Sequence, residues 1–333
     1  MDKVRSLIQS LDGPIMIFGA GGFIGINLLS AILAERLDVI GVSHDHHHNW
    51  RFIASKIPAG HTVSCDITQP ALLAELVSNL RPKTIFNLAA YGAYSKQKEY
   101  RKIFETNVTA NIDIIENAKK FGVSAFVQAG SSSEYGLNSK QPDEHSELIP
   151  NSHYAVSKTA VYQAIKYYGK IEGLPMVHLR LYSAFGPWEE PDRLIPVLLS
   201  QARNGSLPPL VDPDISRDFV YISDVVAAFI FAAARLKPRD FGEAFNVGTG
   251  KKTTIRNLVN QVCKNTGLTQ QPVFSTMDNR KWDTKDWYAD IKRIHLAFRW
   301  KPEVSLSDGL LKTLKWQVEE DFDHAFWNWN RRQ

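Results

Sequence analysis

Short apolar runs rich in β-branched residues alternate with longer stretches of helical periodicity between residues 15 and 247. The predicted strands are Ile15–Phe18, Val39–Val42, Thr62–Cys65, Thr84–Leu88, Ala125–Ala129, Met176–Leu181 and Ala244–Val247. The helical patterns between them include Phe23–Arg36, Ala71–Asn79, Tyr100–Phe121 and Tyr154–Glu172. Strands that alternate with helices are typical of right-handed βαβ units, which build a parallel sheet. The pattern therefore predicts an α/β fold with a doubly wound, seven-stranded parallel sheet.

The alternation weakens from Ser183 onward, where prolines interrupt the chain at positions 187, 191, 196, 208, 209 and 213. Six of the eight tryptophans lie between positions 282 and 329. We therefore expect two parts. Residues 1–182 form the sheet domain, to which residues 219–250 return, and residues 183–218 and 251–333 form a smaller C-terminal lobe that binds the substrate.

The composition is that of a globular protein, with 333 residues of which 44% are hydrophobic and 22% charged. The formal net charge is +4 and no long run of Lys or Arg occurs, which argues against nucleic acid and favours a mildly basic cleft for an anionic small molecule. The segment before Asp12 lacks the apolar core of a signal peptide, and no window reaches the length of a membrane span. We therefore expect a cytoplasmic protein with no membrane association.

No metal site is predicted. The two cysteines, Cys65 and Cys263, lack C-x-x-C spacing, which argues against a disulfide framework and against a thiolate zinc site. The adjacent His46, His47 and His48 cannot all face one ion from a regular element, and no acidic cluster joins them. A solvated loop explains them better.

A glycine-rich turn, Gly19 to Gly25, follows the first predicted strand and opens the first helical pattern. In that context the motif predicts a Rossmann-type site, where the pyrophosphate of a dinucleotide lies at a helix N-terminus. Gly19 would allow the tight turn, Gly22 the approach of the backbone to phosphate, and Gly25 the close packing of helix on strand. Phe23 and Ile24 complete the predicted contact.

The end of the second strand should read the adenosine ribose of the cofactor. An acid that would bind the 2′-hydroxyl of NAD is missing there, and Ser43 and His44 stand in its place. These residues, with Arg51 nearby, could accommodate the 2′-phosphate of NADP, whereas Asp45 could still serve NAD if the loop bends. The sequence thus leaves both cofactors open and favours NADP slightly.

Two further strand ends should contact the cofactor. Asp66 and Ile67 follow the third strand and could contact adenine. Leu88, Ala89 and Ala90 follow the fourth and place small residues beside the dinucleotide.

Tyr154 and Lys158 are four residues apart in a helical pattern, so their side chains share one helix face. An ammonium beside a phenol stabilises the phenolate, which predicts that the Tyr154 pKa falls from about 10 toward neutrality. Such a group can exchange a proton with a substrate hydroxyl or carbonyl. A serine cluster, Ser131 to Ser133, ends the fifth strand and would reach the same site.

Nine motifs occur in the order seen in the extended short-chain dehydrogenases/reductases. They are Gly19–Gly25, Asp66-Ile67, Leu88–Ala90, Asn107, Ser131–Gly136, Tyr154 with Lys158, Arg180–Pro187, Arg217–Val220 and Asn246–Gly248. From about Ile15 to about Leu311 the chain resembles the nucleotide-sugar epimerases, dehydratases and 4-keto reductases of that family. The resemblance implies a nucleoside-diphosphate sugar as substrate, hydride transfer at sugar C4, and a cofactor contact by Asn107.

The resemblance also assigns the catalytic serine by register. It lies four residues before Tyr135, which selects Ser131, with Ser132 as the alternative and as a substrate contact. The 4,6-dehydratases carry a Glu two residues before that tyrosine, where this chain has Ser133. Glu134 stands one place off, so the dehydratase alternative loses most of its support.

The implied substrate contacts lie in the C-terminal half. Ser183 replaces an Asn that relatives often use, and Arg193, Arg217 and Arg280 match positions that hold the pyrophosphate or nucleotide in relatives.

The sequence therefore predicts an NAD(P)-dependent enzyme acting at C4 of a nucleoside-diphosphate sugar, either a 4-keto reductase or a 4-epimerase. A non-catalytic NAD(P)-binding scaffold of the same fold is an alternative. Relatives pair the helices that match Tyr100–Phe121 and Tyr154–Glu172 between two copies. A homodimer is therefore expected, with Ile114, Ala118, Ala164 and Tyr168 as its outward apolar face.

Overall fold

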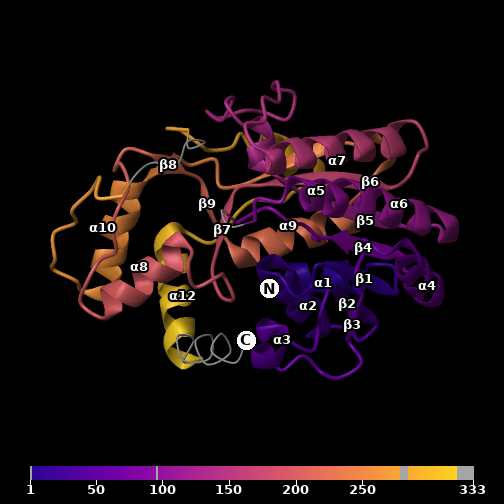
Figure 1. The fold of residues 1–333 in the computed structure, drawn as a ribbon, viewed down its shortest axis with the longest axis horizontal. Coiled ribbons are helices and arrows are strands. Elements are labelled where there is room, and N and C mark those ends of the chain that lie inside the picture. The colour runs from indigo at the N-terminus through magenta and orange to yellow at the C-terminus, as the bar shows by residue number, and fades with distance from the viewer. Residues whose placement is uncertain (1, 95–96, 278–283, 321–333) are drawn as a thin grey trace.

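A computed structural model describes residues 2–94, 97–277 and 284–320 (Figure 1). Its main sheet has seven strands, all of them paired in parallel. In spatial order they are β10 (Ala244–Val247), β6 (Met176–Leu181), β5 (Ala125–Ser131), β4 (Thr84–Asn87), β1 (Ile15–Phe18), β2 (Val39–Ser43) and β3 (Thr62–Ser64). The predicted α/β fold is confirmed, because each strand lies where an apolar run was found in the sequence.

Helices cover both faces of this sheet (Figure 1). They are α1 (Asp2–Gln9), α2 (Phe23–Leu33), α3 (Trp50–Ser55), α4 (Pro70–Leu80), α5 (Tyr100–Phe104), α6 (Ala110–Phe121), α7 (His153–Lys170) and α9 (Ile222–Ala234). On β1, Ile15 and Ile17 pack into the core beneath α2 and α9, whereas Met16 and Phe18 pack beneath α4, α6 and α7. A central strand buried on both faces explains why the predicted strands are continuous apolar runs.

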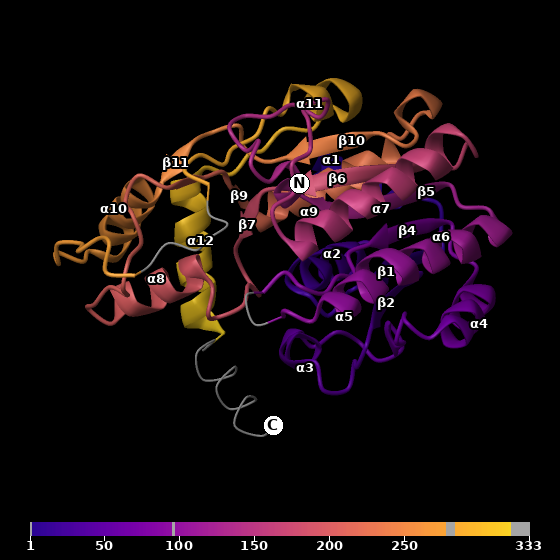
Figure 2. The same ribbon diagram turned by 45° about the horizontal axis from the view of Figure 1, so that its top comes forward.

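The remaining elements form a second lobe beside the carboxyl end of the sheet (Figures 1 and 2). It contains α8 (Leu194–Arg203), α10 (Ile255–Thr266), α12 (Leu306–Glu319) and two small sheets, in which β7 (Ser183–Phe185) pairs with β9 (Phe219–Tyr221) and β8 (Ser216–Arg217) pairs with β11 (Thr253–Thr254). The helix α11 (Lys292–Phe298) packs on β10 at the sheet edge, where the rings of Phe245 and Phe298 are 4.6 Å apart.

One predicted helix, Tyr100–Phe121, is interrupted. A π-helical segment, Glu105–Thr109, separates α5 from α6. Asn107 lies in this segment, fully buried, and its amide donates to Ser157 Oγ at 2.9 Å on α7. Such a π-bulge aims a side chain that a regular helix would place elsewhere.

The predicted outward apolar face on α6 and α7 is wrong. Ile114, Ala118 and Tyr168 are buried in the chain's own core, and Ala164 packs against the same cluster. The apolar stripe that these positions form on α6 and α7 therefore faces the sheet, as the apolar stripe of an amphipathic helix usually does. Among the described residues, no helix combines the length and apolar character needed to cross a bilayer.

Candidate active site

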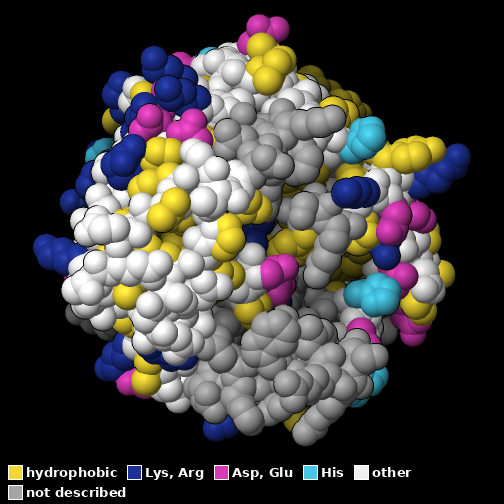
Figure 3. Space-filling model, turned by 60° about the vertical axis from the view of Figure 1, so that its left-hand side comes forward, with side chains coloured by type: hydrophobic (Ala, Val, Ile, Leu, Met, Phe, Trp, Pro, Cys, Tyr) yellow, Lys and Arg dark blue, Asp and Glu magenta, His cyan; other side chains and the backbone are white. Residues whose placement is uncertain are grey.

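A cavity of about 1780 Å³ lies between the carboxyl ends of the strands and the second lobe. Figure 3 shows a hollow in the face of the molecule on this side. The predicted site residues that line the cavity are Gly19, Gly22, Phe23, Ile24, Gly25, Ser43, Leu88, Ala90, Ser131, Ser132, Tyr154, Lys158, Ser183, Arg193 and Arg217. A single-ligand pocket usually measures about 300–1,000 Å³, so this cavity has room for two nucleotide-sized molecules. It is where a parallel α/β sheet binds its ligands.

The glycine turn has the geometry that a dinucleotide requires. Gly19 has φ +74°, and a Cβ there would lie 2.7 Å from the backbone nitrogen of Ala89. A Cβ on Gly25 would overlap the carbonyl of Gly19. Gly22 is the N-cap of α2 and provides no side-chain cap, so the first amides of the helix stay available to an anion in the cavity. The residues present therefore fit a dinucleotide pyrophosphate.

The end of β2 lies beside this turn. A Cβ added to Gly21 would be 2.8 Å from Ser43 Oγ, so Ser43 contacts the turn directly. The His44 side chain is largely exposed, 3.6 Å from the carboxylate of Asp66. Asp66 accepts from the amide and hydroxyl of Thr68, and neither Asp66 nor His44 lines the cavity.

Arg51 lines the cavity, but its side chain is already paired with other groups of the protein. Its side chain is only 4% exposed and lies 2.8 Å from Glu190 Oε1. It also donates to the carbonyls of Trp188, at 2.8 Å, and Gly21. A 2′-phosphate would have to compete with this ion pair and these two hydrogen bonds for the guanidinium, so the structure gives no support to the predicted role of Arg51 in binding NADP.

Three other residues that were predicted to contact the cofactor do not line the cavity. Ile67 and Ala89 are nearly buried and pack in the core beneath α4 and α6. Asn107 holds α7 and the backbone of Tyr91 instead of lining the cavity. It therefore ties the loop at Tyr91 to α7, the helix that carries Tyr154.

Tyr154 and Lys158 lie on the first turns of α7, whose N-cap is the hydroxyl of Ser152. Lys158 Nζ donates to the carbonyl of Ala129 at 3.0 Å and lies 5.8 Å from the centre of the Tyr154 ring. Burial raises the pKa of Tyr154 to about 12, partly offset by a hydrogen bond with Ser131. Burial also lowers the pKa of Lys158 to about 8.

The predicted fall of the Tyr154 pKa is therefore wrong for the protein without cofactor. The ammonium of Lys158 is bonded to the Ala129 carbonyl at the end of β5 and not to the phenol oxygen. Burial, which disfavours the charged form of each group, is the largest cause of both pKa shifts.

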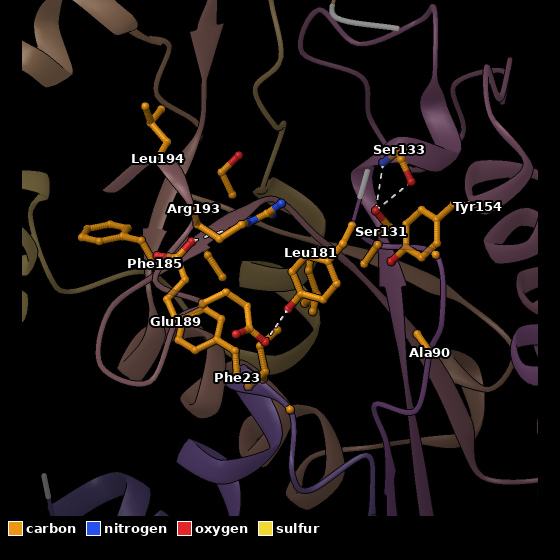
Figure 4. A pocket seen from close by; sticks show the side chains of 18 of the residues that line it. Phe23, Ala90, Ser131, Ser133, Tyr154, Leu181, Phe185, Glu189, Arg193 and Leu194 are labelled. Atoms are coloured by element: carbon orange, nitrogen blue, oxygen red, sulfur yellow. Dashed lines mark hydrogen bonds and ion pairs between the residues drawn. The ribbon is translucent and has the colours of Figure 1, made fainter. Parts of the chain in front are cut away.

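Ser131 ends β5 beside Tyr154 (Figure 4). Its Oγ accepts from the backbone amide of Ser133 at 3.2 Å and from Ser133 Oγ at 2.8 Å. Ser132 begins the short 3-10 turn Ser132–Tyr135, is 8% exposed and also lines the cavity. The structure thus brings Ser131 next to the phenol, while Ser131 and Ser132 both line the cavity.

Glu134 does not line the cavity. It is fully buried, with its carboxylate directed at His178 and Arg180 of β6. A carboxylate in this position cannot serve as the acid or base of a dehydratase at the sugar.

The second lobe supplies basic side chains to the opposite wall. Arg193 lies 3.9 Å from Glu189 (Figure 4). Arg217 donates to the carbonyls of Ser216 and Thr284 and packs on the ring of Trp287, 5.3 Å from its centre. Arg280, also predicted to bind substrate, lies outside the described residues.

Sequence reasoning missed Tyr94 and the acidic pair Glu189 and Glu190, which line the same cavity. Tyr94 Oη donates to Glu190 Oε1 at 3.1 Å. Burial raises the pKa of Glu189 to about 8 despite the nearby Arg193. The sequence did offer a signal for this pair, because two adjacent acids stand in the proline-rich segment just before Arg193.

Comparison with known proteins agrees with this geometry. Residues 15–248 match the model of the NAD dependent epimerase/dehydratase family. The UDP-glucose 4-epimerase of Mycolicibacterium smegmatis is 28% identical over 319 residues, which cover 90% of this chain and 97% of that protein.

Solved structures are also similar. The UDP-glucose 4-epimerase of Thermotoga maritima with UDP-glucose has a TM-score of 0.80 at 25% identity, covering 92% of this chain and 98% of that one. The UDP-glucuronic acid 4-epimerase of Bacillus cereus, in complex with UDP-glucuronic acid and NAD, has a TM-score of 0.80 at 25% identity, covering 92% and 99%.

Proposed function

Because the chain belongs to the NAD dependent epimerase/dehydratase family, we propose that it interconverts the C4 epimers of a nucleoside-diphosphate sugar through a transient 4-ketone. The observation that carries this proposal is one cavity that holds Ser131, Tyr154 and Lys158, with the glycine turn at one end and Arg193 of the second lobe on the facing wall. The glycine turn fits a dinucleotide, and the arginines of the lobe fit the pyrophosphate of a nucleotide sugar.

The chain's own residues have separate roles in this proposal. Tyr154 removes the proton from the sugar 4-hydroxyl and returns it to the 4-keto oxygen. Ser131 hydrogen-bonds the same oxygen and so steadies the charge that develops on it. Lys158 keeps a positive charge beneath the phenol ring, which favours the phenolate. NAD, when bound, supplies the acceptor and donor of hydride at the sugar carbon.

NAD is the proposed cofactor rather than NADP. Arg51, the cation that the sequence offered to a 2′-phosphate, is already engaged by Glu190, Trp188 and Gly21. The similar epimerase of Bacillus cereus was solved with NAD.

A 4-keto-sugar reductase is the second candidate, because Ser43 stands where an acid would read the NAD ribose. A reductase consumes soluble reduced cofactor, whereas an epimerase regenerates its bound cofactor at each turnover. A 4,6-dehydratase is disfavoured because Glu134 is directed into the core.

One experiment tests the proposal. The purified protein is denatured and the released nucleotide is identified by mass spectrometry, and the native protein is then incubated with UDP-sugars that differ at C4. We expect NAD and interconversion of the two epimers with no net change in the absorbance of reduced cofactor. Release of NADP, with oxidation of the reduced cofactor by 4-keto-6-deoxy sugars, would instead establish the reductase. Cofactor binding with no turnover of any nucleotide sugar would establish a scaffold.

We also propose a homodimer, through a different face of the helices than the sequence suggested. Tyr100 of α5 and Val156 and Tyr167 of α7 are exposed by 52%, 39% and 49%, and α5 and α7 pack side by side. The ring of Tyr100 contacts that of His153 on α7. Light scattering at micromolar concentration should give twice the 37.6 kDa of the chain, and Val156→Lys should shift the mass toward the monomer because it buries a charge in the interface. A monomer in both cases would contradict the proposal.

A further inference from the structure

A network of ionisable groups lies directly behind the cavity, and the proposed reaction does not use it. Glu134, His178 and Arg180 are each fully buried. Glu134 Oε1 lies 2.8 Å from His178 Nε2, and Glu134 Oε2 accepts from Arg180 Nε at 2.8 Å. Arg180 in turn donates to Tyr135 Oη at 2.9 Å. Ionic groups with no access to water are costly to fold, so their presence calls for an explanation.

The network reaches the site through Ser131. Glu134 Oε1 also accepts the backbone amide of Ser131 at 2.8 Å, while Ser131 Oγ accepts the amide of Ser133. These two bonds form a capping box across the 3-10 turn, in which each side chain satisfies a backbone amide of the other end. The turn, and with it the direction of the Ser131 side chain, is therefore fixed by the Glu134 carboxylate.

The strand is shaped to admit this carboxylate. A Cβ added to Gly130 would lie 2.7 Å from Glu134 Oε1 and would overlap the ring of His178. Only glycine lets the carboxylate come this close to the last residues of β5, immediately before Ser131.

We infer that Glu134 is a positioning residue of the proposed reaction, which holds the backbone of Ser131 in place and puts a negative charge behind Tyr154 and Lys158. The inference rests on the proposed function. It differs from the catalytic assignment, because Glu134 touches neither the cavity nor any reacting atom.

The charge acts on both neighbours in the same direction. Glu134 raises the pKa of Tyr154 and that of Lys158, because an anion disfavours the phenolate and favours the ammonium. His178, Arg180 and the Ser131 amide keep the pKa of Glu134 below its ordinary value although burial raises it. The titratable groups around Glu134, Tyr154 and Lys158 are His178 and Arg180 of β6, Tyr135 of the 3-10 turn, Tyr162 of α7, and Arg193 at the N-cap of α8. Glu144 lies beside Tyr135 and Arg180, and Glu243 and Arg293 act on Tyr162.

Testing Glu134 alone would leave Arg180 buried without its partner, which by itself destabilises a protein. We therefore compare variants in the Arg180→Met background. Glu134→Gln keeps an oxygen that can accept from Ser131 and removes the charge, whereas Glu134→Met removes both. Unfolding midpoints measured first ensure that all three proteins are folded at the assay temperature.

The Met variant should lose about 10- to 100-fold in kcat relative to the Gln variant, with KM for the nucleotide sugar changed less than about threefold, because a displaced Ser131 affects the reacting oxygen more than binding. Equal kcat in the two variants would overturn the positioning role. The electrostatic role is tested with Arg180 in place, because Arg180 helps to keep Glu134 ionised. Relative to the parent, Glu134→Gln, once its unfolding midpoint shows that it is folded, should move the acid limb of the kcat/KM profile to lower pH, because loss of the anion lowers the Tyr154 pKa. An unchanged limb would overturn the electrostatic role.

Hydrogen exchange supplies a readout that does not depend on the reaction. Peptides spanning residues 129–135 should remain protected in the Gln variant and lose protection in the Met variant. If the parent protein turns over no nucleotide sugar, the proposed function fails, and the kcat values of the variants cannot be compared. The exchange result then decides whether Glu134 fixes the Ser131 turn, and equal protection in both variants would overturn it.

Discussion

Replacing Tyr154 by phenylalanine should lower turnover by about 10²- to 10⁴-fold, the range expected when a general acid–base group is removed. The change deletes one hydroxyl from a ring that is already packed against Lys158, so the fold should survive. Cofactor binding should survive as well, because the glycine turn and the first amides of α2 are untouched. Turnover of the C4 epimers and the stoichiometry of bound NAD are the two measurements.

The pH profile makes this prediction sharper. The phenolate is the proton-accepting form, and its fraction rises with pH, so the parent rate should rise through a limb that belongs to Tyr154. That limb should be absent from the phenylalanine variant.

Tyr167→Phe is the matched control. Tyr167 lies on the same helix, half-exposed, with its hydroxyl donated to Glu172 at 2.8 Å. The same chemical change there should leave turnover within about twofold of the parent, because an exposed hydrogen bond contributes little. A Tyr154→Phe enzyme that keeps near-parent turnover and the same profile would show that Tyr154 and Lys158 are an ordinary helix face.

The elements that could be predicted from the sequence are those whose signal is local. The seven strands are short apolar runs because both faces of the sheet are covered, and a covered strand has no polar positions. The glycine turn could be predicted because a side chain at Gly19 or Gly25 would collide with the turn itself or with the end of the neighbouring strand β4. The choice of Ser131 over Ser132 rests on the register relative to Tyr135 that the family resemblance implies, and it stays a prediction.

The features that could not be predicted depend on contacts between distant segments. The sequence alone does not reveal that Arg51 has a partner, because Glu190, which the fold places beside it, is far away along the chain. The apolar stripe of α6 and α7 could have faced the sheet or a partner, and periodicity alone does not distinguish the two. Glu134 seemed one position from a dehydratase acid. Only the arrangement of β5 and β6 reveals that His178 and Arg180 hold it in the core.

The direction of the Tyr154 pKa was missed for a similar reason. The spacing of Tyr154 and Lys158 is a property of one helix, but the hydrogen bond from Lys158 to Ala129 crosses to β5. Burial of both groups, which the helix does not determine, then controls their proton affinities.

Lys158→Met should remove activity and stabilise the protein without cofactor at pH 7. Turnover should fall by at least about 10²-fold, because the variant lacks the positive charge that favours the phenolate. The gain in stability arises because Lys158 is 2% exposed, and burial lowers its pKa from 10.5 to about 8. That difference corresponds to about 3 kcal/mol against the charged form. Loss of the bond to the Ala129 carbonyl offsets part of it, which leaves an expected gain of about 1–2 kcal/mol.

The pH dependence of this gain has a definite sign. At pH 7 the lysine is protonated in both the folded and the unfolded chain, so the whole penalty of the buried ammonium is present. Between about pH 8 and 10.5 the unfolded chain binds a proton that the folded chain does not, so the stability of the parent rises with pH relative to the variant. The difference between the two proteins should therefore shrink from pH 7 to pH 9.5 in urea unfolding experiments. Lys166→Met, which alters an exposed lysine of the same helix, should show neither the gain nor its pH dependence. A Lys158→Met protein that is less stable than the parent by the same amount at both pH values would mean that the buried ammonium is fully compensated by its surroundings, and that the site is not held at the expense of the fold.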